Sequence, residues 1–323
     1  MPTPSTPDPS APHRADPSAT GPYATEPSAT EPFATGPSAT AADPSGTGTV
    51  LVTGASGTTG SRVVAGLVAA GAPVRAATRR GTTVAGAESA AFDWYDPDTH
   101  PAALDGVDRI YLVAPTGDPE PAAVVRPFLH RARASGVRRA VLLSSSAIAS
   151  GGPALGRIHL ALPEFFEEWA ALRPSWFMQN FLHPPHPHAV SIREEGVIRT
   201  ATGDGRVGFV DADDIAAVAV HTLCTEVGPA DEFVITGPEA LSHDDLAALF
   251  TESTGSRVTH RRLSEAQLAE RLAATMPREY AEVLARLDQA IAAGAEDRVT
   301  DTVQRLTGRP PRSFRSLLAQ HLR

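Results

Sequence analysis

The chain has 323 residues, of which 42% are hydrophobic, and a formal net charge of −9 at pH 7. This length suffices for one large or two modest domains, and the negative charge argues against non-specific binding to nucleic acid or to an anionic membrane surface. All 28 basic residues are arginine, which excludes any mechanism that needs a lysine. The single cysteine, Cys224, excludes an intramolecular disulfide and suits a reducing, cytoplasmic setting.

The N-terminal segment has an unusual composition. No apolar run in the chain is long enough to span a bilayer, and the N-terminus lacks the apolar region of a secretory signal. Residues 16–40 instead form five consecutive pentapeptides, each with proline at its second position. Because regularly spaced proline blocks both helix and sheet, we expect residues 1–45 to be a disordered tail, either a solvated extension or a docking segment.

The first structural motif follows this tail. A strand is expected over 49–53, then glycines at 54, 57 and 60, then an alanine- and valine-rich helix over 61–70. A strand, a glycine turn and a helix bind the pyrophosphate of a dinucleotide, because glycine lets backbone amides approach the phosphates and the helix N-terminus faces them. The spacing G-x-x-G-x-x-G departs from the usual G-x-G-x-x-G, and a purely structural turn is the alternative.

Apolar and helical segments then alternate, which predicts an α/β fold with a parallel sheet. Further strands are expected over 73–78, 90–92, 109–113, 139–144 and 169–172, with helices over 121–135 and from 163 to 169. The region after 172 and up to about 206 is expected to be polar and irregular. A helix is expected to begin within 209–216, where three aspartates are predicted as caps rather than metal ligands.

The last part of the chain is predicted to be mainly helical. A strand is expected over 232–236, and Ser242 is expected to cap a helix. The final sixty residues are expected to be mostly amphipathic helix, broken at 308–311.

The end of the second strand indicates the choice of cofactor. An NAD site commonly places a carboxylate there to accept from the ribose hydroxyl. This chain has Arg79 and Arg80 instead, and no acidic residue before Glu88. Guanidinium groups suit a phosphate dianion, so NADP(H) is predicted in preference to NAD(H). Two solvated surface arginines are the alternative.

Several motifs together resemble the NmrA-like branch of the atypical short-chain dehydrogenases/reductases, and bacterial relatives of the ergot-alkaloid-type reductases above all. Besides the glycine motif, they are the segments 92–94, 144–145, 172–181, 203–216 and 235–242. The resemblance runs from about residue 49 to the C-terminus. It implies a doubly wound Rossmann domain over 46–182 and a smaller C-terminal substrate domain over 183–323, with 207–225 returning to the Rossmann domain.

The resemblance also implies the residues of the cofactor site. The pyrophosphate would be held by Gly54, Ser56, Gly57, Thr58, Thr59 and Gly60. Arg79 would meet the 2′-phosphate, and Phe92 and Asp93 would lie by the adenine. The nicotinamide ribose would lie along Ala114, Pro115 and Thr116, and the nicotinamide end would be closed by Arg173, Pro174 and Trp176.

The Tyr-x-x-x-Lys pair that reduces carbonyls in much of this superfamily is absent, because the chain has no lysine and no tyrosine between 144 and 181. One interpretation is an oxidoreductase that passes hydride to an electrophilic carbon, in an iminium, an enone or a quinone-like molecule. The other is a dinucleotide sensor without turnover. His159 is a candidate acid, with a structural histidine as the alternative, and Ser144 and Ser145 are candidates for orienting the substrate.

The segment after residue 175 is predicted to face a small, largely apolar substrate. Its residues are Trp176, Phe177, Met178, Asn180 and Phe181, and an interdomain core is the alternative for the aromatic ones. Histidines 183, 186 and 188 also suggest a metal site, but proline stiffens the segment and no cysteine is near, so no metal is predicted.

Overall fold

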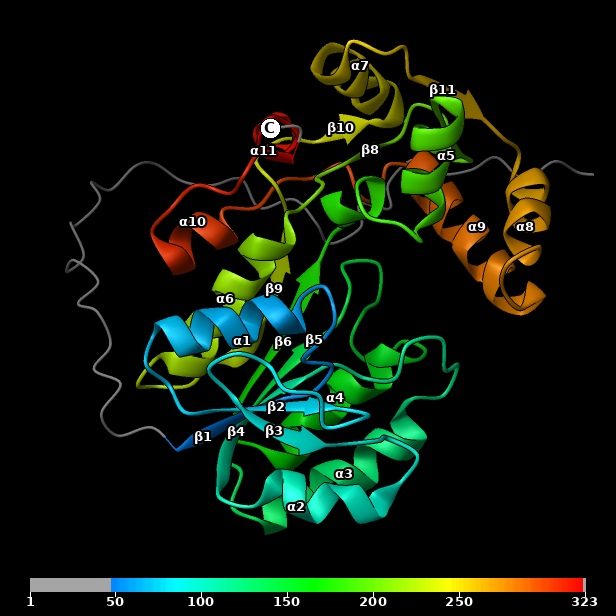
Figure 1. Ribbon diagram of the computed structural model, residues 1–323. Coiled ribbons are helices and arrows are strands. Elements are labelled where there is room, and N and C mark those ends of the chain that lie inside the picture. Colours follow the sequence, from blue (N-terminus) through cyan, green and yellow to red (C-terminus); the bar gives the residue numbers. More distant parts are fainter. Residues whose placement is uncertain (1–47, 322–323) are drawn as a thin grey trace, which may run out of the picture. The chain divides into compact units, whose positions relative to one another are not determined.

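The computed structural model describes residues 48–321, and the predicted disordered tail over 1–45 lies outside them. Seven strands form one parallel sheet in the order β3-β2-β1-β4-β5-β6-β9 (Figure 1). This order reverses direction between β1 and β4 and confirms the doubly wound Rossmann fold. The strands are β1 Thr49–Val52, β2 Val74–Thr78, β3 Glu88–Ala91, β4 Val107–Leu112, β5 Arg139–Leu143, β6 Glu168–Pro174 and β9 Ala230–Ile235.

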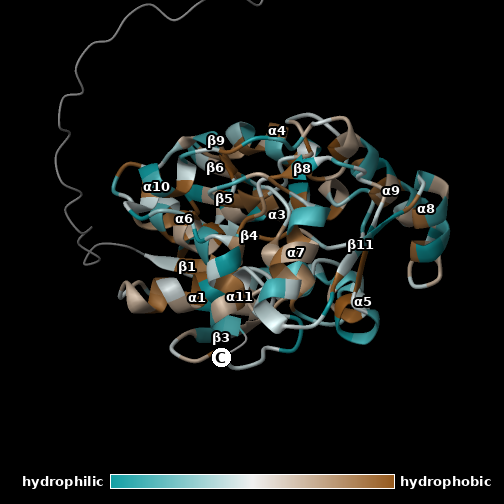
Figure 2. Cartoon of the chain, turned by 90° about the horizontal axis from the view of Figure 1, so that it is seen from above, coloured by the Kyte–Doolittle hydropathy of each residue, from teal (hydrophilic) through white to brown (hydrophobic). Residues whose placement is uncertain are grey.

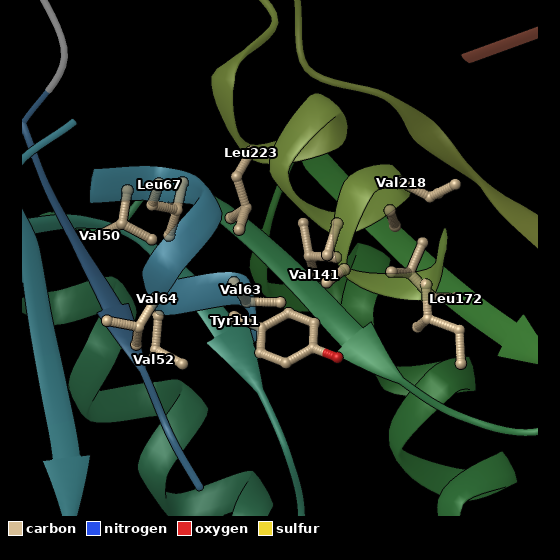
Figure 3. Close-up of a cluster of buried hydrophobic side chains, with 14 of the residues drawn as sticks. Val50, Val52, Val63, Val64, Leu67, Tyr111, Val141, Leu172, Val218 and Leu223 are labelled. Atoms are coloured by element: carbon tan, nitrogen blue, oxygen red, sulfur yellow. The ribbon is translucent and has the colours of Figure 1, made fainter. Parts of the chain in front are cut away.

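Helices cover both faces of the sheet (Figure 1). One face packs against α1 Gly60–Ala69 and α6 Ala212–Cys224, and the other against α2 His100–Leu104, α3 Ala122–Ala134 and α4 Leu155–Phe165. Tyr111, in the middle of β4, is fully buried among Val63, Val64 and Val141 (Figure 3). Burial strongly raises the pKa of its phenol, so this tyrosine belongs to the core.

The remaining elements lie mostly beyond the carboxyl ends of the sheet strands (Figure 1). Here β7 pairs in parallel with β11, and β8 pairs antiparallel with β10. The elements are η1 Pro97–Thr99 and η2 Met178–Phe181, α5 Pro187–Glu195, β7 Val197–Thr200, β8 Arg206–Val207, β10 Leu241–Ser242, α7 His243–Thr254, β11 Thr259–Arg262, α8 Glu265–Ala273, α9 Arg278–Ala292, α10 Thr302–Thr307 and α11 Phe314–His321.

These elements have a hydrophobic core of their own. Phe209, Phe250 and Phe314 pack together with Leu246, so α7 and α11 join around aromatic side chains. Seen from above, hydrophobic residues gather on α7 and α11, whereas α8 at the rim is largely hydrophilic (Figure 2). No helix within residues 48–321 has the length and apolar character needed to cross a membrane.

The helix predicted from 163 to 169 is wrong. That segment instead contains the end of α4 and the start of β6. The helix begins eight residues earlier, at Leu155, inside the glycine-rich segment 151–156, which hides its start in the sequence. Pro163 lies inside the last turns of this helix, where it removes one backbone hydrogen bond.

The prediction of an irregular region up to residue 206 is also wrong, because this region contains α5 and β7. Pro187 occupies the first turn of α5, where a proline nitrogen needs no partner, and Gly196 ends the helix with a φ of 65°. The break predicted at 308–311 is confirmed, but two further interruptions separate α8 from α9 over 274–277 and α9 from α10 over 293–301.

Candidate active site

The glycine loop after β1 forms a compact turn. Gly54 has a φ of +62°, and the Gly57 N–H donates to the Gly54 carbonyl at 2.9 Å. A Cβ on Gly60 would lie 2.1 Å from that same oxygen, so only glycine fits where α1 begins. Thr59 gives α1 no side-chain cap, and no acidic residue lies in its first turn. The helix N-terminus therefore keeps N–H groups for the phosphates of a dinucleotide.

Arg79 and Arg80 follow β2 and are exposed. Among residues 48–321 neither guanidinium has an ion-pair partner, whereas Arg75 earlier on the same strand pairs with Glu88 at 2.9 Å. Unpaired guanidiniums beside the adenosine end of the loop fit a 2′-phosphate dianion. The residues present therefore fit a phosphorylated dinucleotide.

The predicted contacts with the adenine follow β3, and those with the nicotinamide ribose follow β4. Phe92 is 4% exposed and stacks on His100 at 4.8 Å between ring centroids, so its side chain lies in the core below the edge. Asp93 is half-buried and accepts the Tyr95 N–H at 2.9 Å. After β4, Ala114 is buried, Pro115 is half-buried and Thr116 is exposed. The roles assigned to Asp93 and to 114–116 stay predictions, while Phe92 can meet the adenine through its backbone only.

Buried hydroxyl groups lie at the ends of β5 and β6. Ser144 is 6% and Ser175 is 4% exposed, and neither Oγ has a hydrogen-bond partner among residues 48–321. An unsatisfied buried hydroxyl costs about 1–3 kcal/mol, so such a group fits a bound polar molecule. Ser145 differs, because its Oγ accepts the Ala147 N–H at 3.3 Å.

Arg173, on β6, has its partners within the chain. Its Nη1 donates to Glu232 on β9 at 2.6 Å, and its Nη2 donates to the Ser146 carbonyl at 3.1 Å. Pro174 is buried at the end of the strand and accepts the Ser146 N–H at 2.9 Å. That Arg173 closes over the nicotinamide stays a prediction. Its contacts with Glu232 and Ser146 give the guanidinium a structural role as well.

His159 lies on α4 and is 3% exposed. Its Nε2 is 3.4 Å from Glu232, and its Nδ1 has no partner among the described residues. Burial lowers the pKa of His159 most strongly, Glu232 raises it, and Arg173 lowers it again. The ring is therefore largely neutral near pH 7, and its position favours the structural alternative over the candidate acid.

The predicted substrate segment divides into two groups. Met178 and Phe181 are 1% and 2% exposed and belong to the hydrophobic core that also contains Phe314. This burial favours the interdomain-core alternative for both. Trp176, Phe177 and Asn180 are half-buried and stay predicted substrate contacts.

Two of the three nearby histidines contribute to local structure. His186 caps α5 by accepting the His188 N–H at 3.3 Å, and burial lowers the pKa of His186 to about 4. His188 stacks on Phe181 at 4.8 Å. Within the described range, no group of three or more histidine, cysteine, aspartate or glutamate side chains is arranged to hold a metal ion.

The aspartates at the start of α6 act as predicted. Asp211 caps the helix by accepting the Asp213 N–H at 3.0 Å, and it also accepts from the amide of Gln179 at 2.8 Å. The structure adds Arg312, which lies 2.7 Å from Asp211, and Arg309, which lies 2.6 Å from Asp214. These ion pairs tie the segment before α11 to α6.

One residue of the candidate site has no signal of its own in the sequence. Glu296, in the interruption between α9 and α10, is 3% exposed and accepts a hydrogen bond from Ser146 Oγ at 2.7 Å. Segment 293–301 reads as part of a long amphipathic helix, so nothing singles out Glu296. The serine run 144–146 is the one available hint, because it follows a predicted strand.

Comparison with known proteins agrees with this geometry. The family model described as NAD(P)H-binding matches residues 54–226. An uncharacterized oxidoreductase, YesF, from Bacillus subtilis is 44% identical over 273 residues, which is 84% of this chain and 94% of that protein. Festuclavine synthase II from Penicillium roqueforti is 37% identical over 288 residues, covering 84% of this chain and 98% of that protein.

A solved structure shows the same fold. The NADPH-dependent quinone oxidoreductase QOR2 from Escherichia coli, complexed with NADPH, superimposes with a TM-score of 0.73 at 24% identity, covering 85% of this chain and all of that chain. The family match and the two relatives show that the chain belongs to the NAD(P)H-binding, NmrA-like atypical short-chain dehydrogenases/reductases, as an NAD(P)H-dependent oxidoreductase of the ergot-alkaloid-type branch.

Proposed function

We propose that the protein uses NADPH to reduce an electrophilic carbon of a small, largely apolar molecule, and that it does so without an enzymic acid. The bound cofactor supplies the hydride. The chain supplies the glycine loop for the pyrophosphate, Arg79 for the 2′-phosphate, and the hydroxyl groups of Ser144 and Ser175 for orientation at the ends of β5 and β6.

The observation that carries this proposal is that the candidate proton donors near the carboxyl ends of β5 and β6 are poorly suited to act as acids. No lysine exists in the chain, Tyr111 is locked in the core, and His159 is buried and paired with Glu232. The Oγ atoms of Ser144 and Ser175 have no partner among residues 48–321, and a serine hydroxyl without a base is a weak acid. Reduction of an ordinary ketone generates an alkoxide that needs a proton or a strong donor nearby. An iminium ion or a conjugated acceptor accepts hydride without that demand, since its charge is neutralised or delocalised.

The preference for NADPH rests on Arg79 and Arg80. Both are exposed at the end of β2, and no carboxylate there could accept from a bare ribose hydroxyl. The name of the festuclavine synthase relative supports an alkaloid-like acceptor.

The test is an NADPH-oxidation assay with an iminium ion, a conjugated enone and a quinone as acceptors, run beside NADH. Oxidation of NADPH with at least one of the three, and faster than that of NADH, is the expected result. Tight binding of NADPH with no oxidation by any acceptor would contradict the proposal and favour a dinucleotide sensor.

A further inference from the structure

Glu296 places a carboxylate at the edge of the sheet where the substrate must lie. The dinucleotide extends across the carboxyl ends of the strands, with Arg79 after β2 at one end and the glycine loop after β1 near the switch point. Its nicotinamide end therefore lies toward β5 and β6. Ser146 is fixed between these two strands by its N–H bond to Pro174, and its Oγ donates to Glu296 at 2.7 Å.

The charge of Glu296 is less completely neutralised than that of other buried carboxylates. Asp211 and Asp214 are both fully buried, and each has an arginine nitrogen within 2.7 Å. Glu296 is 3% exposed, but its nearest cation is Arg298 at 3.4 Å. The side chain of Arg298 is 41% exposed, and its Nη2 also donates to the Ser146 carbonyl at 3.3 Å. A buried anion with weak pairing favours a further cation beside it.

A second observation points to a ligand at the same edge. The buried hydroxyls of Ser144 and Ser175 lack partners among residues 48–321, and they lie at the ends of the two strands that hold Ser146. Buried polar groups are normally satisfied, so these hydroxyls indicate a place where a bound molecule completes the hydrogen bonding.

We propose that Glu296 is a specificity residue that selects cationic acceptors, namely iminium ions and other organic cations. This inference rests on the proposed function. When hydride bonds to the iminium carbon, the C=N π electrons become a nitrogen lone pair, so the acceptor becomes a neutral amine while the positive charge passes to the nicotinamide. Glu296 therefore attracts the acceptor before the reaction more strongly than the product after it. Its loss raises the KM of a cationic acceptor and changes kcat little.

The central variant is Glu296→Gln, whose amide oxygen can still accept from Ser146. Two acceptors are compared, the cation N-methyl-3,4-dihydroisoquinolinium and the neutral quinone menadione. We expect KM for the cation to rise about tenfold or more, which is the change for about 1.4 kcal/mol, while KM for menadione stays the same. Glu296→Asp, which keeps the charge, should restore part of the preference.

Glu164→Gln is the matched control, because it removes the same charge from an exposed glutamate on α4. An equal rise in KM for both acceptors, or none for either, would overturn the proposal and leave Glu296 as a structural tether.

A measurement on the unaltered protein covers the case in which Glu296→Gln does not fold. Benzyltrimethylammonium carries a permanent charge and cannot accept hydride, and neopentylbenzene is its neutral counterpart. The cation should compete with menadione at a concentration at least about tenfold below that needed by the neutral compound. Equal inhibition by the two compounds would also overturn the proposal.

The two proposals fail separately. If menadione is reduced but the KM of the cationic acceptor does not depend on Glu296, the inference fails and the proposed function stands. If no acceptor is reduced, the proposed function fails. Calorimetric binding of benzyltrimethylammonium and neopentylbenzene to the NADPH complex then still tests Glu296, and equal affinities would overturn it.

Discussion

Gly60 opens α1 directly against the carbonyl oxygen of Gly54, where an added Cβ would lie only 2.1 Å from that oxygen. Gly60→Ala must therefore move either the loop or the helix. We expect the free energy of unfolding to fall by about 1–3 kcal/mol, the usual cost of overpacking, and NADPH affinity to fall with it. Urea unfolding and a cofactor titration measure the two effects.

Gly57→Ala is the matched control within the same loop. Its Cβ would lie 3.2 Å from the same oxygen, and its φ is not positive, so the turn accommodates it with a small shift. We expect near-normal stability for this variant. If Gly60→Ala were as stable as Gly57→Ala, the close approach between Gly60 and Gly54 would not constrain the loop.

Arg79→Ala tests the cofactor preference. Loss of a hydrogen-bonded charge at the 2′-phosphate should weaken NADPH binding by about 1.5–3 kcal/mol, while NADH binding should stay nearly constant. Calorimetric titration of the same protein with each cofactor supplies the internal control. Equal losses for NADPH and NADH would show that Arg79 does not contact the phosphate.

Local sequence signals predicted most of the fold. The glycine loop, the buried strands and the Ser242 cap are set by residues close in sequence, and the structure has each of them, including the reciprocal hydrogen bonds between Ser242 and Asp245. Errors arose where glycine or proline lies inside or beside a regular element, as at Pro163 and Pro187. Pro187 stands in the first turn of α5, where a helix tolerates proline, whereas Pro163 costs α4 one backbone hydrogen bond near its C-terminal end.

The site was predicted less completely, because its contacts join distant parts of the chain. His159 meets Glu232 across 73 residues, and Ser146 meets Glu296 across 150 residues. No local sequence pattern shows which distant carboxylate will contact the residues at the carboxyl ends of the sheet strands. The loop around Gly54 is accessible to prediction because it lies within a single strand, turn and helix.

His159→Ala tests whether an acid is needed. The ring is buried and neutral, so kcat should change by less than the roughly 10²–10⁴-fold that general acid catalysis contributes. The assay follows NADPH oxidation with a quinone at pH 7, with cofactor affinity measured in parallel. A loss within that range at unchanged cofactor affinity would make His159 the proton donor.

His243 should make the fold sensitive to acid. Burial and, to a smaller extent, the neighbouring His260 lower the pKa of His243 to about 3 although Asp244 opposes the shift, whereas the unfolded value is about 6.5. The unfolded chain therefore binds a proton between these values, and stability falls as pH decreases below 6.5. The loss from this group between pH 7.5 and pH 5 amounts to about 2 kcal/mol at most.

Replacement of His243 by asparagine checks this origin. Asparagine can keep a hydrogen bond to Thr202, which lies 2.9 Å from the His243 Nδ1, but it does not titrate. The difference in unfolding free energy between wild type and His243→Asn should shrink as pH falls from 7.5 to 5. A difference that stays constant over this range would exclude His243 as the source.

The central claim is that hydride transfer depends on the electrophilicity of the acceptor and needs no enzymic acid. The most direct measurement compares kcat/KM for NADPH oxidation with menadione or N-methyl-3,4-dihydroisoquinolinium and with cyclohexanone, an unactivated ketone. The account predicts turnover of an activated acceptor and none detectable with cyclohexanone, whose alkoxide would lack a proton donor. Efficient reduction of cyclohexanone would contradict it.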